Sequence, residues 1–110
     1  MENPVAGTAF YPLYLSLEGM RCLVAGLGQV GRRKLEGVLA CNPALVLVLD
    51  IDAPSPGDAA LDALLRHGSV RFERRACEEG DVQGMALVFA ATGNDAENRR
   101  IAAACRRNGV

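Results

Sequence analysis

The stretch of sequence that decides the fold is MRCLVAGLGQVG, from Met20 to Gly31. Its first half is a short apolar run, and its second half is rich in glycine. After Gly31, apolar residues recur at the spacing of one helix face, at Leu35, Val38 and Leu39. A change from a continuous apolar run to this period predicts a strand, a glycine-rich turn and a helix.

The glycines match G-x-G-x-x-G in the context in which this pattern indicates a dinucleotide site, between a strand and a helix. Gly26 allows the tight turn, Gly28 lets a pyrophosphate approach the backbone, and Gly31 lets the helix pack closely on the sheet. The phosphates would lie on the N–H groups at the positive end of the helix dipole. The alternative is a glycine-rich turn without a ligand.

The next residues complete a β-α-β unit. Asn42-Pro43 ends the helix, since proline lacks an N–H, and LVLVL at 45–49 is typical of a strand covered on both faces. Asp50 follows, 19 residues after Gly31, where a carboxylate can accept hydrogen bonds from the adenosine ribose. Because a carboxylate repels a 2′-phosphate, the sequence favours NAD over NADP. Asp52 could share or take this role.

Two further helices are predicted in the second half of the chain. The first begins at Asp58, a candidate N-cap, and ends at His67-Gly68. His67 is the only histidine, and its place at a helix end favours interaction with the helix dipole over catalysis. The second begins at Asn94, with Glu97 in the position of a capping box, and ends at Asn108-Gly109.

Two further strands are also predicted. Residues 70–74 alternate between polar and apolar, which is typical of an edge strand, and ALVFAA at 86–91 predicts a second fully buried strand. Thr92, at the carboxyl end of that strand, either caps the following turn or contacts a cofactor. Val110 is interpreted as the first residue of a fifth strand.

The resulting order of elements, β-α-β-α-β-β-α, predicts an α/β fold of the Rossmann type. Right-handed crossovers give a doubly wound parallel sheet with strand order 3-2-1-4 and the alternating strand at one edge. The 110 residues fit one domain, 1–110. Because the far side of the fourth strand would otherwise lie open, we expect this domain to be the N-terminal part of a longer protein, truncated before a fifth strand.

Composition and charge exclude several classes of function. With 12 Lys and Arg against 13 Asp and Glu, the net charge is -1, which gives no overall positive field for nucleic acid or an anionic membrane. No apolar run approaches the ~18 residues of a membrane span. The cysteines show no metal or redox spacing and are predicted to be small buried hydrophobes in a reducing cytoplasm: Cys22, Cys41, Cys77 and Cys105.

Two basic runs have open roles. Arg32, Arg33 and Lys34 follow the glycine turn, and a solvated helix face is favoured over contact with a cofactor or an anionic substrate. The arginines of the last helix are expected to face water or a partner subunit: Arg99, Arg100, Arg106 and Arg107. No Ser-His-Asp set or pair of catalytic carboxylates is evident, and no catalytic residue is assigned.

Several motifs go beyond a generic dinucleotide-binding domain. They are YPLYL at 11–15 followed by Leu17-Glu18-Gly19, the pair Arg33-Lys34, Ala90-Ala91-Thr92, and Asn98-Arg99-Arg100-Ile101. In these motifs the chain resembles the N-terminal domain of siroheme synthase, the precorrin-2 dehydrogenase family. The resemblance extends over nearly the whole chain.

The resemblance implies oxidation of precorrin-2 to sirohydrochlorin, with NAD+ accepting the hydride, on the route to siroheme; some family members also insert iron. It also implies a homodimer built through segments outside this chain. The family's general-base aspartate lies beyond Val110, so the 110 residues are expected to bind cofactor without catalysing the reaction. The implied cofactor contacts are Gly26, Gly28, Gln29, Val30, Asp50, Ile51 and Thr92.

A nucleotide-sensing module of a potassium-transport system is the alternative. Its fingerprint also reads G-L-G-x-V-G, and its second strand ends in D-x-D, as residues 49–52 do here. Against it, residues 74–77 (RRAC) replace the G-D-A segment of these modules, and the YPLYL opening has no counterpart in them. The enzyme family is therefore favoured.

Overall fold

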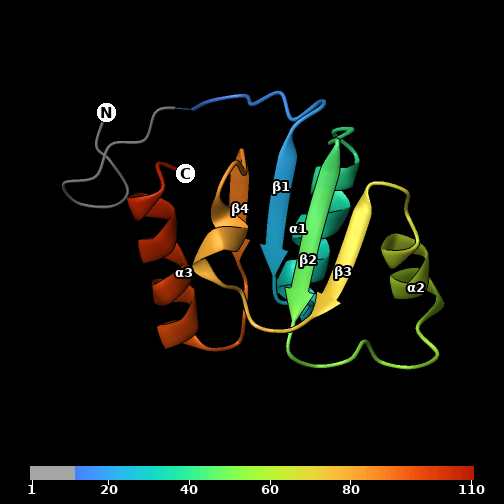
Figure 1. The fold of residues 1–110 in the computed structure, drawn as a ribbon. Helices are drawn as coiled ribbons and strands as arrows, with labels where there is room; N and C mark the ends of the chain where they lie inside the picture. The colour runs from blue at the N-terminus through green and yellow to red at the C-terminus, as the bar shows by residue number, and fades with distance from the viewer. Residues whose placement is uncertain (1–11) are drawn as a thin grey trace, which may run out of the picture.

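The computed structural model describes residues 12–110 and contains one four-stranded sheet (Figure 1). Tyr11, the first residue of the YPLYL segment, lies outside the described range. The sheet order is β3-β2-β1-β4 and all three pairings are parallel, so the predicted fold is confirmed. The strands are β1 (Arg21–Ala25), β2 (Leu45–Asp50), β3 (Val70–Arg74) and β4 (Leu87–Ala90).

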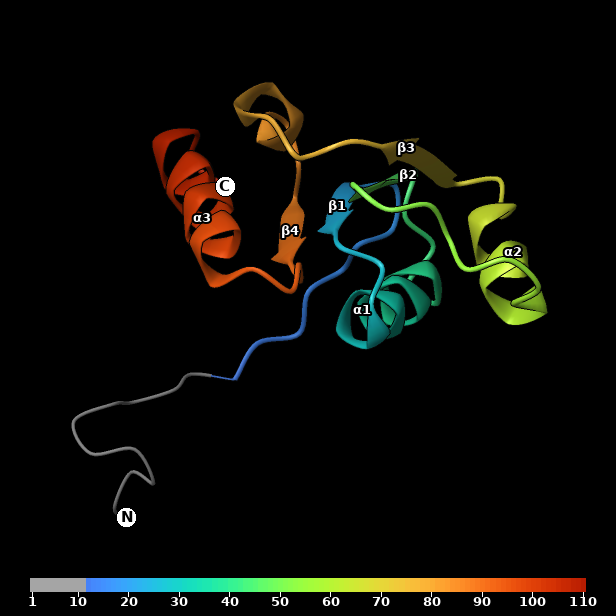
Figure 2. The same ribbon diagram turned by 90° about the horizontal axis from the view of Figure 1, so that it is seen from below.

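Helices cover both faces of the sheet (Figure 2). On one face lie α1 (Gln29–Leu39) and α2 (Ala59–Leu65). On the other lie α3 (Asp95–Arg107) and a short 3₁₀ helix, η1 (Glu79–Val82). No helix within residues 12–110 has the length and apolarity needed to cross a membrane.

The unbroken apolar runs form a separate core on each face of the sheet. In β1, Leu23 packs towards α3 and η1, whereas Val24 packs towards α1. Leu47 and Val48 of β2 divide in the same way. Because successive side chains of a strand point to opposite faces, a central strand covered on both sides must be apolar throughout. Leu23 is fully buried, and its truncation to Ala should cost about 2–5 kcal/mol.

The prediction of a fully buried fourth strand is wrong. All four residues of β4 are only half-buried, since within the described residues β4 pairs with β1 alone and lies at an edge of the sheet. The expected burial of every cysteine is also wrong. Cys22 and Cys77 are buried, but Cys105 is half-buried and Cys41 is exposed, because Cys41 follows α1 in a surface turn.

The structure also differs from the prediction at the end of one helix and in one short helix that was not predicted. α2 begins at the predicted N-cap, Asp58, but ends at Leu65 with Arg66 as C-cap. His67 therefore lies in the following turn, where its Nδ1 accepts a hydrogen bond from the Ser69 N–H at 3.1 Å. The helix η1 was not predicted, since it is only four residues long. Its N-terminus is capped by a reciprocal pair of hydrogen bonds between Glu78 and Asp81.

Candidate functional site

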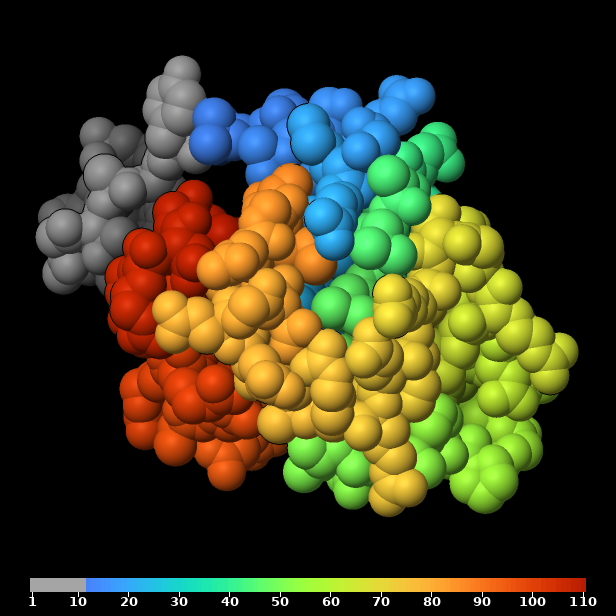
Figure 3. Space-filling model, in the orientation of Figure 1, coloured from blue at the N-terminus to red at the C-terminus, as the bar shows by residue number. Residues whose placement is uncertain are grey.

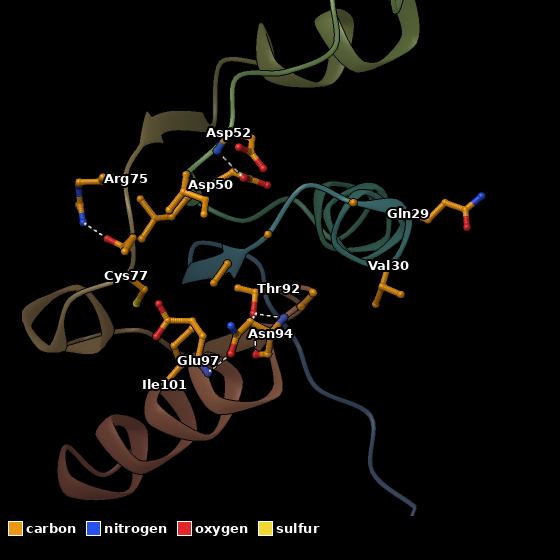
Figure 4. Close-up of a pocket in the computed structure, with 18 residues that line it drawn as sticks. Gln29, Val30, Asp50, Asp52, Arg75, Cys77, Thr92, Asn94, Glu97 and Ile101 are labelled. Carbon is orange, nitrogen blue, oxygen red and sulfur yellow. Dashed lines mark hydrogen bonds between the residues drawn. The ribbon is translucent and has the colours of Figure 1, made fainter.

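A cleft of about 620 Å³ lies at the carboxyl ends of β1, β2 and β4 (Figure 4). This is the switch point of the sheet, because the chain leaves β1 for β2 on one side and β4 pairs with β1 on the other. Of the residues predicted to contact cofactor, all except Gly31 line the cleft: Gly26, Gly28, Gln29, Val30, Asp50, Ile51 and Thr92. Gly31 is buried beneath the turn.

Two of the three glycines in the turn are required by close packing. Gly26 has φ of +105°, and a Cβ there would lie 2.4 Å from the carbonyl oxygen of Ala91. A Cβ on Gly31 would lie 1.7 Å from the carbonyl oxygen of Gly26. A Cβ on Gly28, in contrast, would have no atom of residues 12–110 within 4 Å beyond its two chain neighbours. Packing among the described residues therefore does not require glycine at position 28.

The N-terminus of α1 is open towards the cleft. The side chain of Asp58 caps α2 and that of Asn94 caps α3, but no side chain among residues 12–110 caps α1. The first hydrogen bond of α1 runs from the Arg32 N–H to the Gly28 carbonyl, at 2.9 Å, so the preceding N–H groups lack partners within the helix. Such groups, together with the helix dipole, favour binding of an anion. The side chain of Gln29 points away from the cleft, which leaves its backbone as the group that faces a ligand (Figure 4).

Asp50 joins the end of β2 to the glycine turn. Its Oδ2 accepts a hydrogen bond from the Leu27 N–H at 2.7 Å, and its Oδ1 accepts one from the Asp52 N–H at 2.8 Å. A carboxylate offers about four lone-pair positions, so Asp50 can still accept hydrogen bonds from a ligand. Asp52 and Ile51 are both exposed beside it, and 66% of Ile51 is accessible.

Thr92 caps the turn that follows β4, which is one of its two predicted roles. Its hydroxyl accepts a hydrogen bond from the Asn94 N–H at 3.3 Å. The Asn94 side chain in turn accepts one from the Glu97 N–H at 2.9 Å, as predicted for the start of α3. The carboxylate of Glu97 pairs with Arg100, and this ion pair lowers the pKa of Glu97.

The segment that follows β3 forms a wall of the cleft that the sequence interpretation missed. It contributes Arg75, Ala76 and Cys77 to the cleft lining. In the space-filling view, this part of the chain lies at the front of the molecule between the residues of α3 and those of α2 (Figure 3). Arg75 forms a forked ion pair with Asp81, with N–O distances of 2.6 and 2.8 Å, which lowers the pKa of Asp81. Burial raises the pKa of the Cys77 thiol to about 11, so this thiol stays protonated at neutral pH.

The basic runs lie outside the cleft. Arg32 pairs with Asp58 through two contacts, at 2.6 and 3.2 Å, and so links α1 to the start of α2. Arg33 is exposed, and the Nζ of Lys34 lies 5.7 Å from the centre of the Phe89 ring. In α3, Arg100 contacts Glu97 and the Cys77 carbonyl. Arg107 pairs with Glu79. The side chains of Arg99 and Arg106 are exposed.

Residues 13–110 match the family model NAD_binding_7, whose description is "Putative NAD(P)-binding". The chain belongs to this NAD(P)-binding family. The family match extends over almost all of the described residues, and so includes the open N-terminus of α1 and Asp50.

The relatives of this NAD(P)-binding domain confirm the resemblance inferred from its motifs. It is 35% identical over 101 residues to the siroheme synthase of Methylococcus capsulatus, covering 92% of the chain and 20% of the relative. It is 32% identical over 100 residues to siroheme synthase 1 of Halorhodospira halophila, covering 91% and 20%. The chain thus spans about a fifth of the length of these curated relatives.

Among solved structures, the domain is similar to SirC, precorrin-2 dehydrogenase. The TM-score is 0.72 at 24% sequence identity, and the match covers 84% of this chain and 44% of that chain. This likeness supports the fold. None of the matches named above supports the alternative of a potassium-transport module.

Proposed function

We propose that this chain is the NAD-binding domain of a precorrin-2 dehydrogenase in a protein of the siroheme synthase type. The reaction removes a hydride and a proton from precorrin-2 to give sirohydrochlorin, and the nicotinamide of NAD+ takes the hydride. The observation that carries the proposal is the pairing, in one cleft, of an uncapped helix N-terminus with the carboxylate of Asp50. The names of the siroheme synthase relatives support the choice of substrate.

The residues around the cleft suit the parts of a dinucleotide. The N–H groups at the start of α1 would hold the pyrophosphate, and the open space beside Gly28 lets it approach the backbone. Asp50 would accept the hydroxyls of the adenosine ribose. Ile51, exposed beside Asp50, offers an apolar surface for the adenine ring. The second nucleotide would then lie towards Thr92 and Gly93, at the end of β4.

We propose NAD rather than NADP as the cofactor. Asp50 and Asp52 both line the cleft at the end of β2, so a phosphate on the adenosine 2′ position would meet two carboxyl side chains. The guanidinium of Arg74 lies nearby, but its Nε donates to the Ile51 carbonyl at 3.1 Å and the residue does not line the cleft.

Calorimetric titration of the chain with NAD+ tests the proposed NAD-binding function. Saturable binding of NAD+ supports this function, and absence of binding refutes it.

We further propose that the domain forms the N-terminal part of a longer cytoplasmic protein. Its curated relatives are about five times as long, and the outer edge of β4 pairs with no strand in residues 12–110. A groove of about 320 Å³ beside that edge, lined in part by Leu87, Val88, Cys105 and Val110, would accept a fifth strand. All four cysteines are free, which favours a reducing compartment. The family resemblance supports a homodimer formed through segments outside this chain.

A further inference from the structure

The amide side chain of Asn98 holds both backbone groups of Thr92. The Thr92 N–H donates to Asn98 Oδ1 at 3.1 Å, and Asn98 Nδ2 donates to the Thr92 carbonyl at 3.0 Å. The Thr92 hydroxyl also contacts Asn98 Oδ1. The last pairing of β4 with β1 on this side is the hydrogen bond from the Ala91 N–H to the Ala25 carbonyl, at 2.8 Å. Asn98 therefore continues, from α3, the pairing that the sheet stops providing at Ala91.

The position of Thr92 affects the shape of the cleft on two sides. Thr92 and Gly93 line the cleft themselves. The glycine turn packs directly against the same backbone, since a Cβ on Gly26 would lie 2.9 Å from the Thr92 nitrogen. A shift of Thr92 would thus alter the distance between the turn after β4 and the turn after β1. Gly93 has no side chain to restrain this segment, so its restraint comes from the hydrogen bonds of Asn98 to the Thr92 backbone, together with those of the Thr92 hydroxyl to Asn94.

We propose that Asn98 is a positioning residue for the dinucleotide, which fixes the Thr92–Gly93 turn so that the β4 side of the cleft is formed before the ligand binds. The inference rests on the proposed function and names a residue that does not itself line the cleft. Ordering a mobile turn at the moment of binding costs free energy, and a turn that is already held avoids that cost.

The sheet order indicates which half of the dinucleotide depends on Asn98. Asp50 ends β2 and would hold the adenosine, whereas Thr92 follows β4 on the other side of β1. In a doubly wound sheet a dinucleotide lies across this switch point, with one nucleotide on each side. Loss of Asn98 should therefore weaken binding of NAD+ more than binding of ADP, which lacks the second nucleoside.

The test is calorimetric titration of the chain and its Asn98→Ala variant with NAD+ and with ADP. We expect the Kd for NAD+ to rise at least about tenfold, and the Kd for ADP to change by less than about threefold; tenfold corresponds to 1.4 kcal/mol. Asn98→Asp serves as a second, nearly isosteric variant. It keeps an acceptor for the Thr92 N–H but loses the donor to the Thr92 carbonyl, so its NAD+ affinity should fall between the other two.

Asn108→Ala is the matched control. Asn108 is half-buried at the other end of α3, and its Nδ2 donates to the Ala104 carbonyl at 2.7 Å, while its Oδ1 accepts from Gln83 at 3.3 Å. None of these residues lines the cleft. The control should lower the melting temperature about as much as Asn98→Ala and leave the Kd for NAD+ unchanged.

Two results would overturn the inference. One is wild-type affinity for NAD+ in the folded Asn98→Asp variant, which decides the matter even where Asn98→Ala is unfolded. The other is an equal loss of NAD+ and ADP affinity, which would show a general structural role. Absence of NAD+ binding by the unsubstituted chain would instead refute the proposed function, and this inference with it.

Discussion

The carboxylate of Asp50 accepts a hydrogen bond from the backbone N–H of Leu27, with a distance of 2.7 Å between oxygen and nitrogen. The acid of the fingerprint and the glycine turn of the fingerprint are therefore in direct contact, although 23 residues separate them in the chain. The contact holds the carboxylate at the edge of the cleft before any ligand arrives. It also means that Asp50 supports the glycine turn, in addition to the ribose contact that we propose for it.

The first prediction concerns cofactor selectivity. We expect the chain to bind NAD+ at least about tenfold more tightly than NADP+, because an added phosphate beside Asp50 and Asp52 meets like charge. Asp50→Ala should weaken NAD+ binding and reduce the ratio of the affinities for NAD+ and NADP+. Calorimetric titration of each variant with both cofactors measures the effect. Equal affinity for the two cofactors would contradict the selectivity argument, and unchanged NAD+ affinity in Asp50→Ala would assign the ribose to Asp52.

The second prediction separates two glycines of the same turn. Gly28→Val should leave the helix content unchanged, since a Cβ at position 28 would meet no atom of residues 12–110 within 4 Å beyond its two chain neighbours. The substitution should raise the Kd for NAD+ about a hundredfold or more by filling the space of the pyrophosphate. Gly31→Ala should instead destabilise the fold, because its Cβ would lie 1.7 Å from the Gly26 carbonyl oxygen. Circular dichroism and titration together distinguish these outcomes. An unfolded Gly28→Val variant would show that the pyrophosphate site beside Gly28 is wrongly assigned.

The architecture was predictable because it depends on patterns that are local in sequence. The apolar run LVLVL forms a central strand, and the glycine spacing at 26, 28 and 31 places a turn between β1 and α1. The contacts that shape the cleft were less accessible, since they join residues that only the folded chain brings together. Asp50 with Leu27 and Arg100 with the Cys77 carbonyl are each 23 residues apart. Nothing in the local pattern of either partner predicts them.

The contact between Asn98 and Thr92 had a weak sequence signal. Both residues belong to stretches that resemble the siroheme synthase family, which marks them as a pair of interest without giving a reason. The reason is geometric: Asn98 is six residues after Thr92 and is the fourth residue of α3, and from there its amide reaches back to the backbone of Thr92. A single sequence does not show which way an asparagine in this position points.

The third prediction concerns stability in acid. The ion pair with Arg75 lowers the pKa of Asp81 in the folded state, so its contribution is present above the ordinary carboxyl pKa of about 4 and is lost as the pH falls through the lowered value. The melting temperature should therefore fall between about pH 5 and pH 2. Asp81→Asn should be less stable near neutral pH and should show a shallower loss in acid. Parallel acid profiles for the variant and the unsubstituted chain would contradict this assignment.

The fourth prediction concerns the cysteines. Cys41 is exposed and should react first with a thiol reagent near neutral pH, whereas Cys77 should react slowly, because it is buried and burial raises the pKa of its thiol to about 11. Mass spectrometry of peptides after timed labelling measures both rates. Cys41→Ser should remove the fast phase and leave the slow one. Fast labelling of Cys77 in the folded chain would show that the wall after β3 opens readily.

The last prediction is that the 110-residue chain does not convert precorrin-2, although it binds NAD+. Loss of a hydride and a proton requires a positioned base and a substrate held against the nicotinamide. Among the described residues that line the cleft, the carboxylates are Asp50, Asp52 and Glu97. Asp50 supports the glycine turn, and the pKa of Glu97 is lowered by Arg100, which makes Glu97 a weak base.

The thiol of Cys77 cannot serve as the base either, because its raised pKa keeps it protonated at neutral pH. The test is to incubate the chain with precorrin-2 and NAD+ and to follow the absorbance of sirohydrochlorin, with a full-length siroheme synthase as positive control. We expect product from the control and none from the chain. Turnover by the chain would show that one of these residues acts as the base. An Asp52→Asn variant of the chain would then test whether that base is Asp52. Of the three carboxylates, Asp52 is the one whose side chain makes no hydrogen bond or ion pair within residues 12–110.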